Sequence, residues 1–103
     1  KSLGGEGGPK PGEGPSKEER ETGFYDVLFI AQSEGTEIHV VVTGDRDPGY
    51  GSTSKMIAES ALCLINEAKD AAGGIWTPGA VMGPALRARL VKSAGLTFDV
   101  VAA

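Results

Sequence analysis

Apolar and polar residues alternate through two neighbouring runs of residues 24–44, which read FYDVLFIAQSEGTEIHVVVTG. The runs are rich in β-branched and aromatic residues, and the polar break between them contains a glycine, a pattern typical of a β-hairpin. If Glu34 and Gly35 form the turn, apolar residues face each other across the two strands. One face then carries Val27, Phe29 and Ala31 beside Val42, Val40 and Ile38, and the other carries Leu28, Ile30, Val41 and His39. The sequence therefore predicts an antiparallel hairpin whose second face is only half polar.

Residues 52–69 follow a helical rather than an alternating pattern. Their apolar positions recur with helical spacing at Ile57, Ala61, Leu64, Ile65 and Ala68. Three further apolar residues broaden this stripe to most of the helix circumference: Met56, Leu62 and Cys63. We therefore expect a helix that is buried on more than one side and that ends within residues 71–74, where glycine occurs.

The last third of the chain predicts a second helical region and a strand. Thr77 and Pro78 are typical of a helix cap followed by proline in the first turn, and Gly83 and Pro84 indicate a second such start. The expected apolar stripe consists of Leu86, Leu90, Val91 and Ala94. Gly95 ends the helix, and residues 96–101 alternate as a third strand. The predicted fold class is α+β: a small, mainly antiparallel sheet, made of the hairpin and the C-terminal strand, with helices packed on one face.

Composition divides the 103 residues into two parts. Residues 1–23 hold seven of the sixteen glycines and a single aliphatic residue, Leu3, so we expect a flexible Gly/Pro-rich segment there. Residues 24–103 form the expected α+β domain. The net charge is −4 without a cluster of Lys or Arg, which argues against a nucleic-acid partner. Since no apolar run approaches the roughly 20 residues of a membrane span, we expect a cytoplasmic protein without one.

For three individual residues, Cys63, His39 and Trp76, the sequence predicts no catalytic or metal-binding role. Cys63 excludes an internal disulfide and, in an apolar helix, is expected to behave as a small hydrophobe. His39 leaves no cluster for zinc, so no metal site is predicted and this side chain is interpreted as structural or exposed. Trp76 could fill the core or line a pocket, and we expect the core.

The most conspicuous candidate site is the loop GDRDPGYGSTSK, residues 44–55. A phosphate-binding loop requires a lysine directly after its second glycine, and Tyr50 occupies that place, so a nucleoside triphosphate site is excluded. Asp45 and Asp47 flank Arg46, and the two carboxylates could act in acid–base chemistry or could fix a turn through Asx hydrogen bonds. Glycines and the amides at the start of the following helix would favour an anion.

Three segments together resemble a known family. They are GPSKEERETGFYDV (14–27), GDRDPGYGSTSKMIAESALCLI (44–65) and GGIWTPGAVMGPALRARLVKSAGLTFDV (73–100). They are similar to the C-terminal part of bacterial saccharopine dehydrogenase-like oxidoreductases, including those described as trans-acting enoyl reductases. The resemblance implies a parent protein with an N-terminal Rossmann domain for NAD or NADP, and it implies that this chain belongs to the second, substrate-side domain. The chain has no Gly-x-Gly-x-x-Gly between a strand and a helix, so the fragment itself is expected to bind no cofactor and to be inactive alone.

The resemblance also suggests a role for the loop at residues 44–55. It would face the substrate or cofactor, although no catalytic residue is assigned. The residues expected on that loop surface are Asp45, Arg46, Asp47, Gly49, Tyr50, Gly51, Ser52 and Thr53. The expected partners are the missing Rossmann domain, a small-molecule substrate and, in a homodimer, a second copy of the chain. The alternative interpretation is a self-contained module that binds a small ligand or a protein and has no reductase activity.

Overall fold

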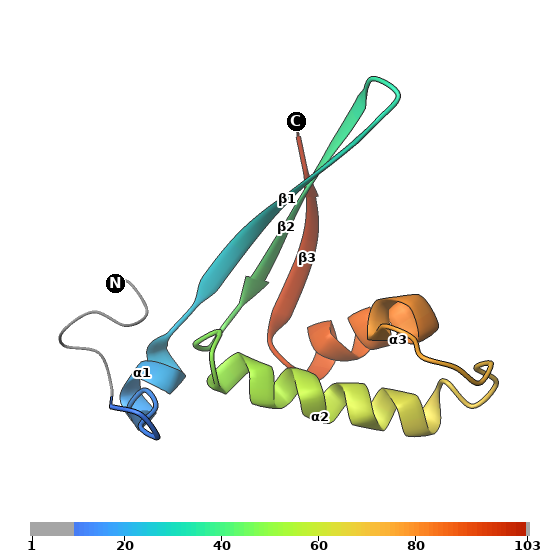
Figure 1. Cartoon of the computed structure of the whole chain (residues 1–103). Helices are drawn as coiled ribbons and strands as arrows, with labels where there is room; N and C mark the ends of the chain where they lie inside the picture. The colour runs from blue at the N-terminus through green and yellow to red at the C-terminus, as the bar shows by residue number, and fades with distance from the viewer. Residues whose placement is uncertain (1–9, 103) are drawn as a thin grey trace.

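The computed structural model describes residues 10–102, which form a three-stranded antiparallel sheet and three helices (Figure 1). The elements in chain order are α1 (Lys17–Thr22), β1 (Tyr25–Ser33), β2 (Thr36–Gly44), α2 (Gly51–Asn66), α3 (Pro78–Ser93) and β3 (Leu96–Val101). The strands lie in the order β1-β2-β3. The predicted α+β fold class, with a hairpin and a C-terminal strand in one small sheet, is confirmed.

The hairpin has the predicted register. Val27 pairs with Val42 and Phe29 pairs with Val40, and the ladder continues without interruption to Ser33 and Thr36. The turn residues Glu34 and Gly35 have φ angles of 48° and 81°. Positive φ at both central residues is the type I′ geometry that matches the twist of a two-residue hairpin.

β3 completes the sheet on the other side of β2. Val42 pairs with Phe98 and Gly44 pairs with Leu96, in antiparallel register. Near the same end of the ladder, the hydroxyl groups of Thr43 and Thr97 are 2.8 Å apart and share a hydrogen bond. β2 is therefore the central strand.

α3 begins and bends at the predicted prolines. The Thr77 side chain accepts a hydrogen bond from the backbone N–H of Ala80, and Pro78 is the first helical residue. Met82 leaves helical geometry, with φ −145° and ψ 23°, two residues before Pro84. Proline cannot donate the backbone bond of a continuous helix, so a break just before it is expected. Gly95, with φ 74°, follows the C-cap of the helix and leads into β3.

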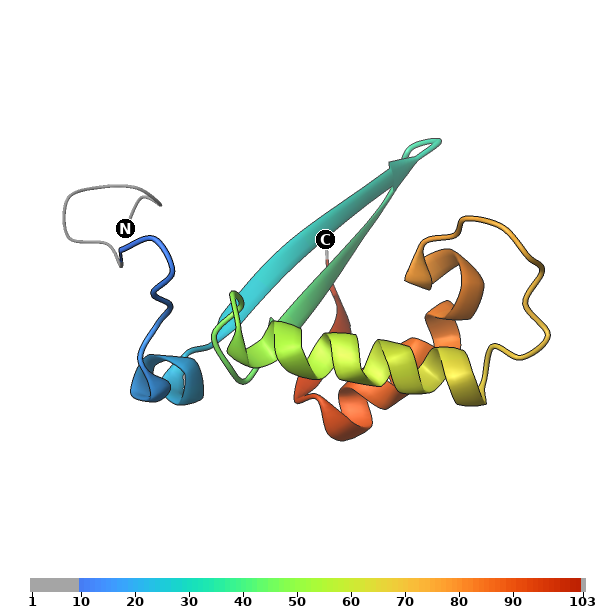
Figure 2. The same ribbon diagram turned by 60° about the horizontal axis from the view of Figure 1, so that its bottom comes forward.

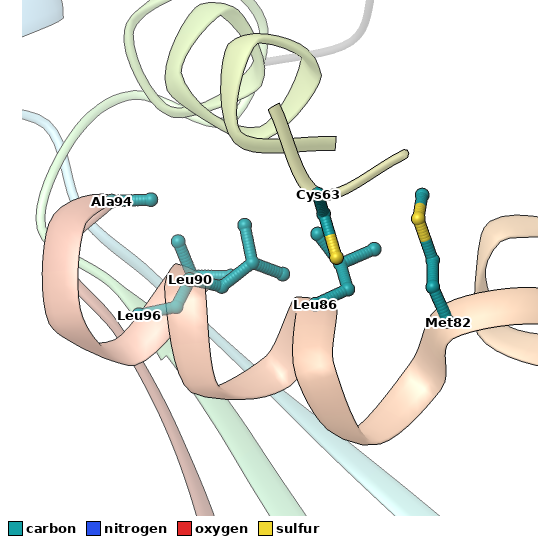
Figure 3. Packing of buried hydrophobic residues seen from close by; sticks show 6 residues of the cluster. All are labelled: Cys63, Met82, Leu86, Leu90, Ala94 and Leu96. Atoms are coloured by element: carbon teal, nitrogen blue, oxygen red, sulfur yellow. The ribbon is translucent and has the colours of Figure 1, made fainter. Parts of the chain in front are cut away.

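The hydrophobic core lies between α2, α3 and the start of β3 (Figure 3). Cys63 points from α2 towards Leu86 of α3. The cluster consists of Cys63, Met82, Leu86, Leu90, Ala94 and Leu96. The prediction that Cys63 acts as a small hydrophobe is confirmed, as is most of the α3 stripe. Val91 is the exception, since it is 52% exposed.

The prediction that α2 is buried on more than one side is wrong within the described residues. Ile57, Leu64 and Ile65 are 69%, 54% and 66% exposed. α2 packs on α3 through the face that carries Cys63, and the strands lead away from that helix pair instead of covering its far side (Figures 1 and 2). The pattern identified apolar residues correctly but could not reveal which of them have a neighbour in this chain.

The prediction that Trp76 belongs to the core is also wrong. Its side chain is 55% exposed, and its indole N–H donates to the carbonyl of Ala72 within the same connection between α2 and α3. No helix of the described part of the chain is both long enough and apolar enough to cross a membrane.

Candidate functional site

The N-terminal side of the candidate site is a short helix that the sequence interpretation did not include. In α1, the Ser16 hydroxyl accepts from the Glu19 N–H at 3.2 Å, and the Glu19 carboxylate accepts from the Ser16 N–H at 2.9 Å. This is a capping box, and the spacing of Ser16 and Glu19 is its sequence signature. The signal was therefore available within the Gly/Pro-rich segment. The first nine residues of that segment lie outside the described residues, and its flexibility remains a prediction.

α1 and the residues around it contact the loop between β2 and α2. The Asp47 N–H donates to the carbonyl of Arg20 at 3.3 Å. A Cβ atom on Gly23 would lie 2.8 Å from the Asp47 backbone, and one on Gly14 would lie 3.5 Å from the Tyr50 ring. The close approach at Gly23 leaves no room for a side chain. The segment 14–23 thus packs against one side of the loop.

Asp47 organises the loop from within. One carboxylate oxygen accepts from the N–H groups of Gly49 and Tyr50 at 2.9 and 3.1 Å, and the other accepts from Gly51 at 2.6 Å. Its backbone carbonyl accepts from the Ser52 N–H at 2.9 Å. The bond from Gly51, followed by those from Tyr50 and Gly49, lowers the pKa of Asp47 below its usual value, and Arg20 contributes in the same direction.

These contacts change the interpretation of the start of α2. Free amides at the start of this helix were expected to favour an anion. In the structure the amide of Gly51, the first residue of α2, donates to the Asp47 carboxylate, as do the amides of Gly49 and Tyr50 just before it. The alternative that Asp47 fixes a turn through Asx hydrogen bonds is confirmed. A Cβ on Gly51 would lie 2.8 Å from both the Arg20 carbonyl and the Asp47 carboxylate, so this glycine is required for the close approach.

The two acids of the loop have separate partners. Asp45 forms an ion pair with Lys55 at 3.4 Å, and its carboxylate packs directly against Gly95 at the start of β3. Asp47 instead faces the amides of its own loop. The geometry therefore gives each carboxylate its own structural contacts and shows no shared proton between them.

The hydroxyl groups of the loop also bond within the fold. Ser52 is completely buried, and its Oγ lies 2.8 Å from the hydroxyl of Tyr25. Thr53 donates to the Pro48 carbonyl at 2.7 Å. Among the described residues, the Arg46 guanidinium and the Tyr50 hydroxyl have no hydrogen bond or ion pair, and Tyr50 is 58% exposed. Arg46 and Tyr50 are therefore the polar groups of the loop that remain available to a ligand.

A second cluster of charged groups fastens α2 to α3. Arg89 of α3 donates to Glu59 of α2 at 2.9 Å and to Glu67, the C-cap residue of α2, at 2.7 Å. Burial is the main factor that raises the pKa of the Cys63 thiol, and a hydrogen bond to Glu67 raises it further. A thiol that resists deprotonation is a poor nucleophile, so this cluster is structural.

His39 lies on β2 beside Glu37 and is partly buried. Hydrogen bonds lower the pKa of Glu37, with the larger effect from Gln32 and the smaller one from His39. A shallow concavity near these residues is lined by residues 32–37 around the hairpin turn, at the opposite end of the sheet from α2 (Figure 1). Across residues 10–102, no three His, Cys, Asp or Glu side chains are grouped so that they could hold a metal ion.

Comparison with known proteins shows that the chain is similar to one part of a larger protein. No protein-family profile and no solved structure matches the chain. A Mycobacterium tuberculosis (strain H37Rv) protein, provisionally named a trans-acting enoyl reductase, is 39% identical over 94 residues, which are 88% of this chain and 22% of that protein. The trans-acting enoyl reductase of Mycobacterium ulcerans is 36% identical over 87 residues, which are 82% of this chain and 21% of that protein. The chain thus spans about a fifth of the length of the curated relatives it matches.

Proposed function

We propose that this chain is the substrate-side domain of an NAD(P)-dependent oxidoreductase of the saccharopine dehydrogenase-like type, related to trans-acting enoyl reductases. The observation that carries the proposal is spatial. The three segments of the resemblance contact one another at the loop 44–55: Gly14 and Gly23 approach it from one side, Tyr25 bonds to Ser52, and Gly95 packs on Asp45. The sequence similarity to the relatives extends over most of the chain.

In this proposal the nicotinamide dinucleotide is held by a separate Rossmann domain and supplies the hydride. Two features argue against a phosphate site in this domain. Asp47 occupies the amides at the start of α2, and the strand-glycine-helix fingerprint of dinucleotide binding is absent from the chain. This domain would instead form a wall of the substrate cleft.

The loop would present two groups to a small-molecule substrate. Arg46 would pair with a carboxylate or phosphate of the substrate, because its guanidinium has no acidic partner among residues 10–102. The exposed Tyr50 ring, which lies beside Gly14, would contact an apolar or planar part of the substrate. Asp47, Ser52 and Thr53 would position the loop without touching the substrate. A cytoplasmic location belongs to the same proposal.

The first test is the coding sequence that precedes Lys1. A strand, a Gly-x-Gly-x-x-Gly turn and a helix encoded in frame would support the proposal. Calorimetric titration of the 103-residue chain with NADH and NADPH should show no binding, whereas a polypeptide that includes the upstream region should bind one of them. Micromolar binding by the 103-residue chain alone would contradict the assignment of the cofactor to another domain.

The second test distinguishes a role of the loop in substrate binding from a role in cofactor binding. In the longer polypeptide, Arg46→Ala and Tyr50→Ala should lower kcat/KM for the substrate while the affinity for the dinucleotide stays unchanged. Arg87→Ala is the matched control, because Arg87 is an exposed arginine of α3 without a partner among the described residues. Equal activity of all three variants would exclude the loop from the substrate site.

The alternative function is a protein-interaction module without reductase chemistry. The exposed apolar residues of the hairpin favour it, since Leu28, Phe29 and Ile30 are each more than half exposed. An upstream region without a dinucleotide-binding unit would decide for this alternative.

A further inference from the structure

The outer edge of β1 is long, regular and uncovered by the described residues. β1 is nine residues long, and β2 is its neighbour on one side only. Edge strands of natural sheets are usually protected by lysine, proline or a bulge. The β1 sequence YDVLFIAQS has none of these: its pairing with β2 runs one to one, and Asp26 is its single charged residue. This edge is therefore suited to pair with another strand.

The hairpin turn determines which backbone groups face the open edge. Ser33 and Thr36 close a two-residue turn, so they and every second pair beyond them exchange backbone hydrogen bonds. The odd-numbered residues of β1 consequently bond to β2. The even-numbered residues direct their N–H and C=O groups outward, and these are Asp26, Leu28, Ile30 and Gln32.

We propose that β1 pairs with β1 of a second copy of this chain, antiparallel, about a two-fold axis that passes through Phe29. In this register Leu28 lies opposite Ile30 of the second copy, so apolar residues meet. Asp26 lies opposite Gln32 of the second copy, and the Gln32 amide retains an N–H beyond the one that it gives to Glu37. The two chains would form one continuous six-stranded sheet.

Neighbouring registers lack this complementarity. An axis through Leu28 would place Asp26 opposite Ile30, and an axis through Ile30 would place it opposite Glu34, a residue of like charge. Axes through Val27 or Ala31 likewise set a polar residue of the outward-facing set against an apolar one. Because a one-residue difference moves every cross-strand pair, the Phe29 axis is the register that the sequence selects.

The pairing also unites an exposed apolar face. Val27 and Phe29, which are 44% and 54% exposed, lie on the same face of the sheet as Val100, which is 76% exposed. In the proposed dimer the two Phe29 side chains are neighbours across the axis, as a pair without mutual backbone hydrogen bonds. The inference does not depend on the proposed function, because it uses only the edge of β1.

Disulfide trapping in the 103-residue chain tests the register. Residues on the axis in such a pair have Cα atoms about 4.5 Å apart, within the range that a disulfide spans. Phe29→Cys should therefore give a covalent dimer on mild oxidation. Ala31→Cys is the matched control, because residue 31 lies opposite Val27 and the two introduced thiols would be roughly 13 Å apart. The unaltered chain should give no covalent dimer, since Cys63 is completely buried.

Charge substitution tests the interface by an independent route. Sedimentation equilibrium at about 100 μM should detect a dimer of the unaltered chain. Leu28→Lys should raise the dimer dissociation constant at least about tenfold, because the symmetry repeats the unfavourable contact. The double variant Leu28→Lys with Ile30→Glu should restore the dimer, since each introduced lysine would face an introduced glutamate. A monomeric unaltered chain, a dimer unaffected by Leu28→Lys, failure of the double variant to restore the dimer, or equal trapping by Ala31→Cys would overturn the proposal.

Discussion

The hydroxyl groups of Tyr25 and Ser52 share a hydrogen bond of 2.8 Å that joins the first residue of β1 to the first turn of α2. Ser52 is completely buried, and Gly44, the strand partner of Tyr25, lies so close to the Tyr25 ring that a Cβ there would overlap it. One aromatic side chain thus fixes both the end of the hairpin and the start of the helix. The loop 44–55 is held between them.

Tyr25→Phe should lower the free energy of unfolding by about 1–3 kcal/mol, because it leaves the buried Ser52 hydroxyl without its partner. Urea denaturation followed by circular dichroism measures the change. Ser52→Ala combined with Tyr25→Phe should cost less than the sum of the single changes. Strictly additive costs would show that the bond contributes nothing.

Asp47→Asn should destabilise the protein at neutral pH and should make little difference in acid. The backbone bonds to its carboxylate lower the pKa in the folded state. Their stabilisation is therefore present above about pH 4, where an unperturbed aspartate titrates, and is lost as the pH falls through the lower folded pKa. Denaturation midpoints measured from pH 7 to pH 2 should converge for the two proteins. Asp70→Asn, at an exposed residue after α2, provides the comparison.

Arg89→Lys should lower the denaturation midpoint although it keeps the charge. The guanidinium reaches Glu59 and Glu67 through two different nitrogen atoms, and a single ammonium cannot reproduce that fork. Arg87→Lys on the exposed side of α3 should leave the midpoint unchanged. The difference between these variants should shrink in about 1 M salt, where the Debye length is only about 3 Å. An identical response of both positions would show that the Arg89 contacts do not stabilise the helix pair.

Gly95→Ala should cost more stability than Gly35→Ala. Both glycines have positive φ, 74° and 81°, so alanine would be strained at either position by about 1–2 kcal/mol. A Cβ at Gly35 meets open space, whereas one at Gly95 would overlap the Asp45 carboxylate. Asp45→Ala should therefore recover part of the cost of Gly95→Ala. If Asp45→Ala has no such effect, the contact does not limit the position.

Local signals predicted the elements, and the failures occurred where a distant neighbour decides the outcome. The turn at Gly35 and the cap at Thr77 act over a few residues, so the hairpin register and the start of α3 followed from the sequence. Ile57 and Leu64 were expected in the core because they are apolar at helical spacing, but no pattern reveals that the sheet leads away from α2. The site differs, because Asp47 bonds to amides only two to four residues away. The sequence offered this Asx turn as one of two interpretations, and only the structure decided between it and acid–base chemistry.

The position of β2 between its two neighbours has a kinetic consequence. β1 is joined to β2 through a two-residue turn, whereas the bond between Thr43 and Thr97 spans 54 residues of sequence. Closing a long loop costs more entropy and is slower, so the hairpin can form early, whereas β3 cannot pair with β2 until the intervening residues of α2 and α3 have been synthesised. During synthesis, β2 would therefore emerge with one edge paired and the other still open. The edge of β2 that later binds β3 therefore stays unpaired from the synthesis of Gly44 until Leu96 docks against it.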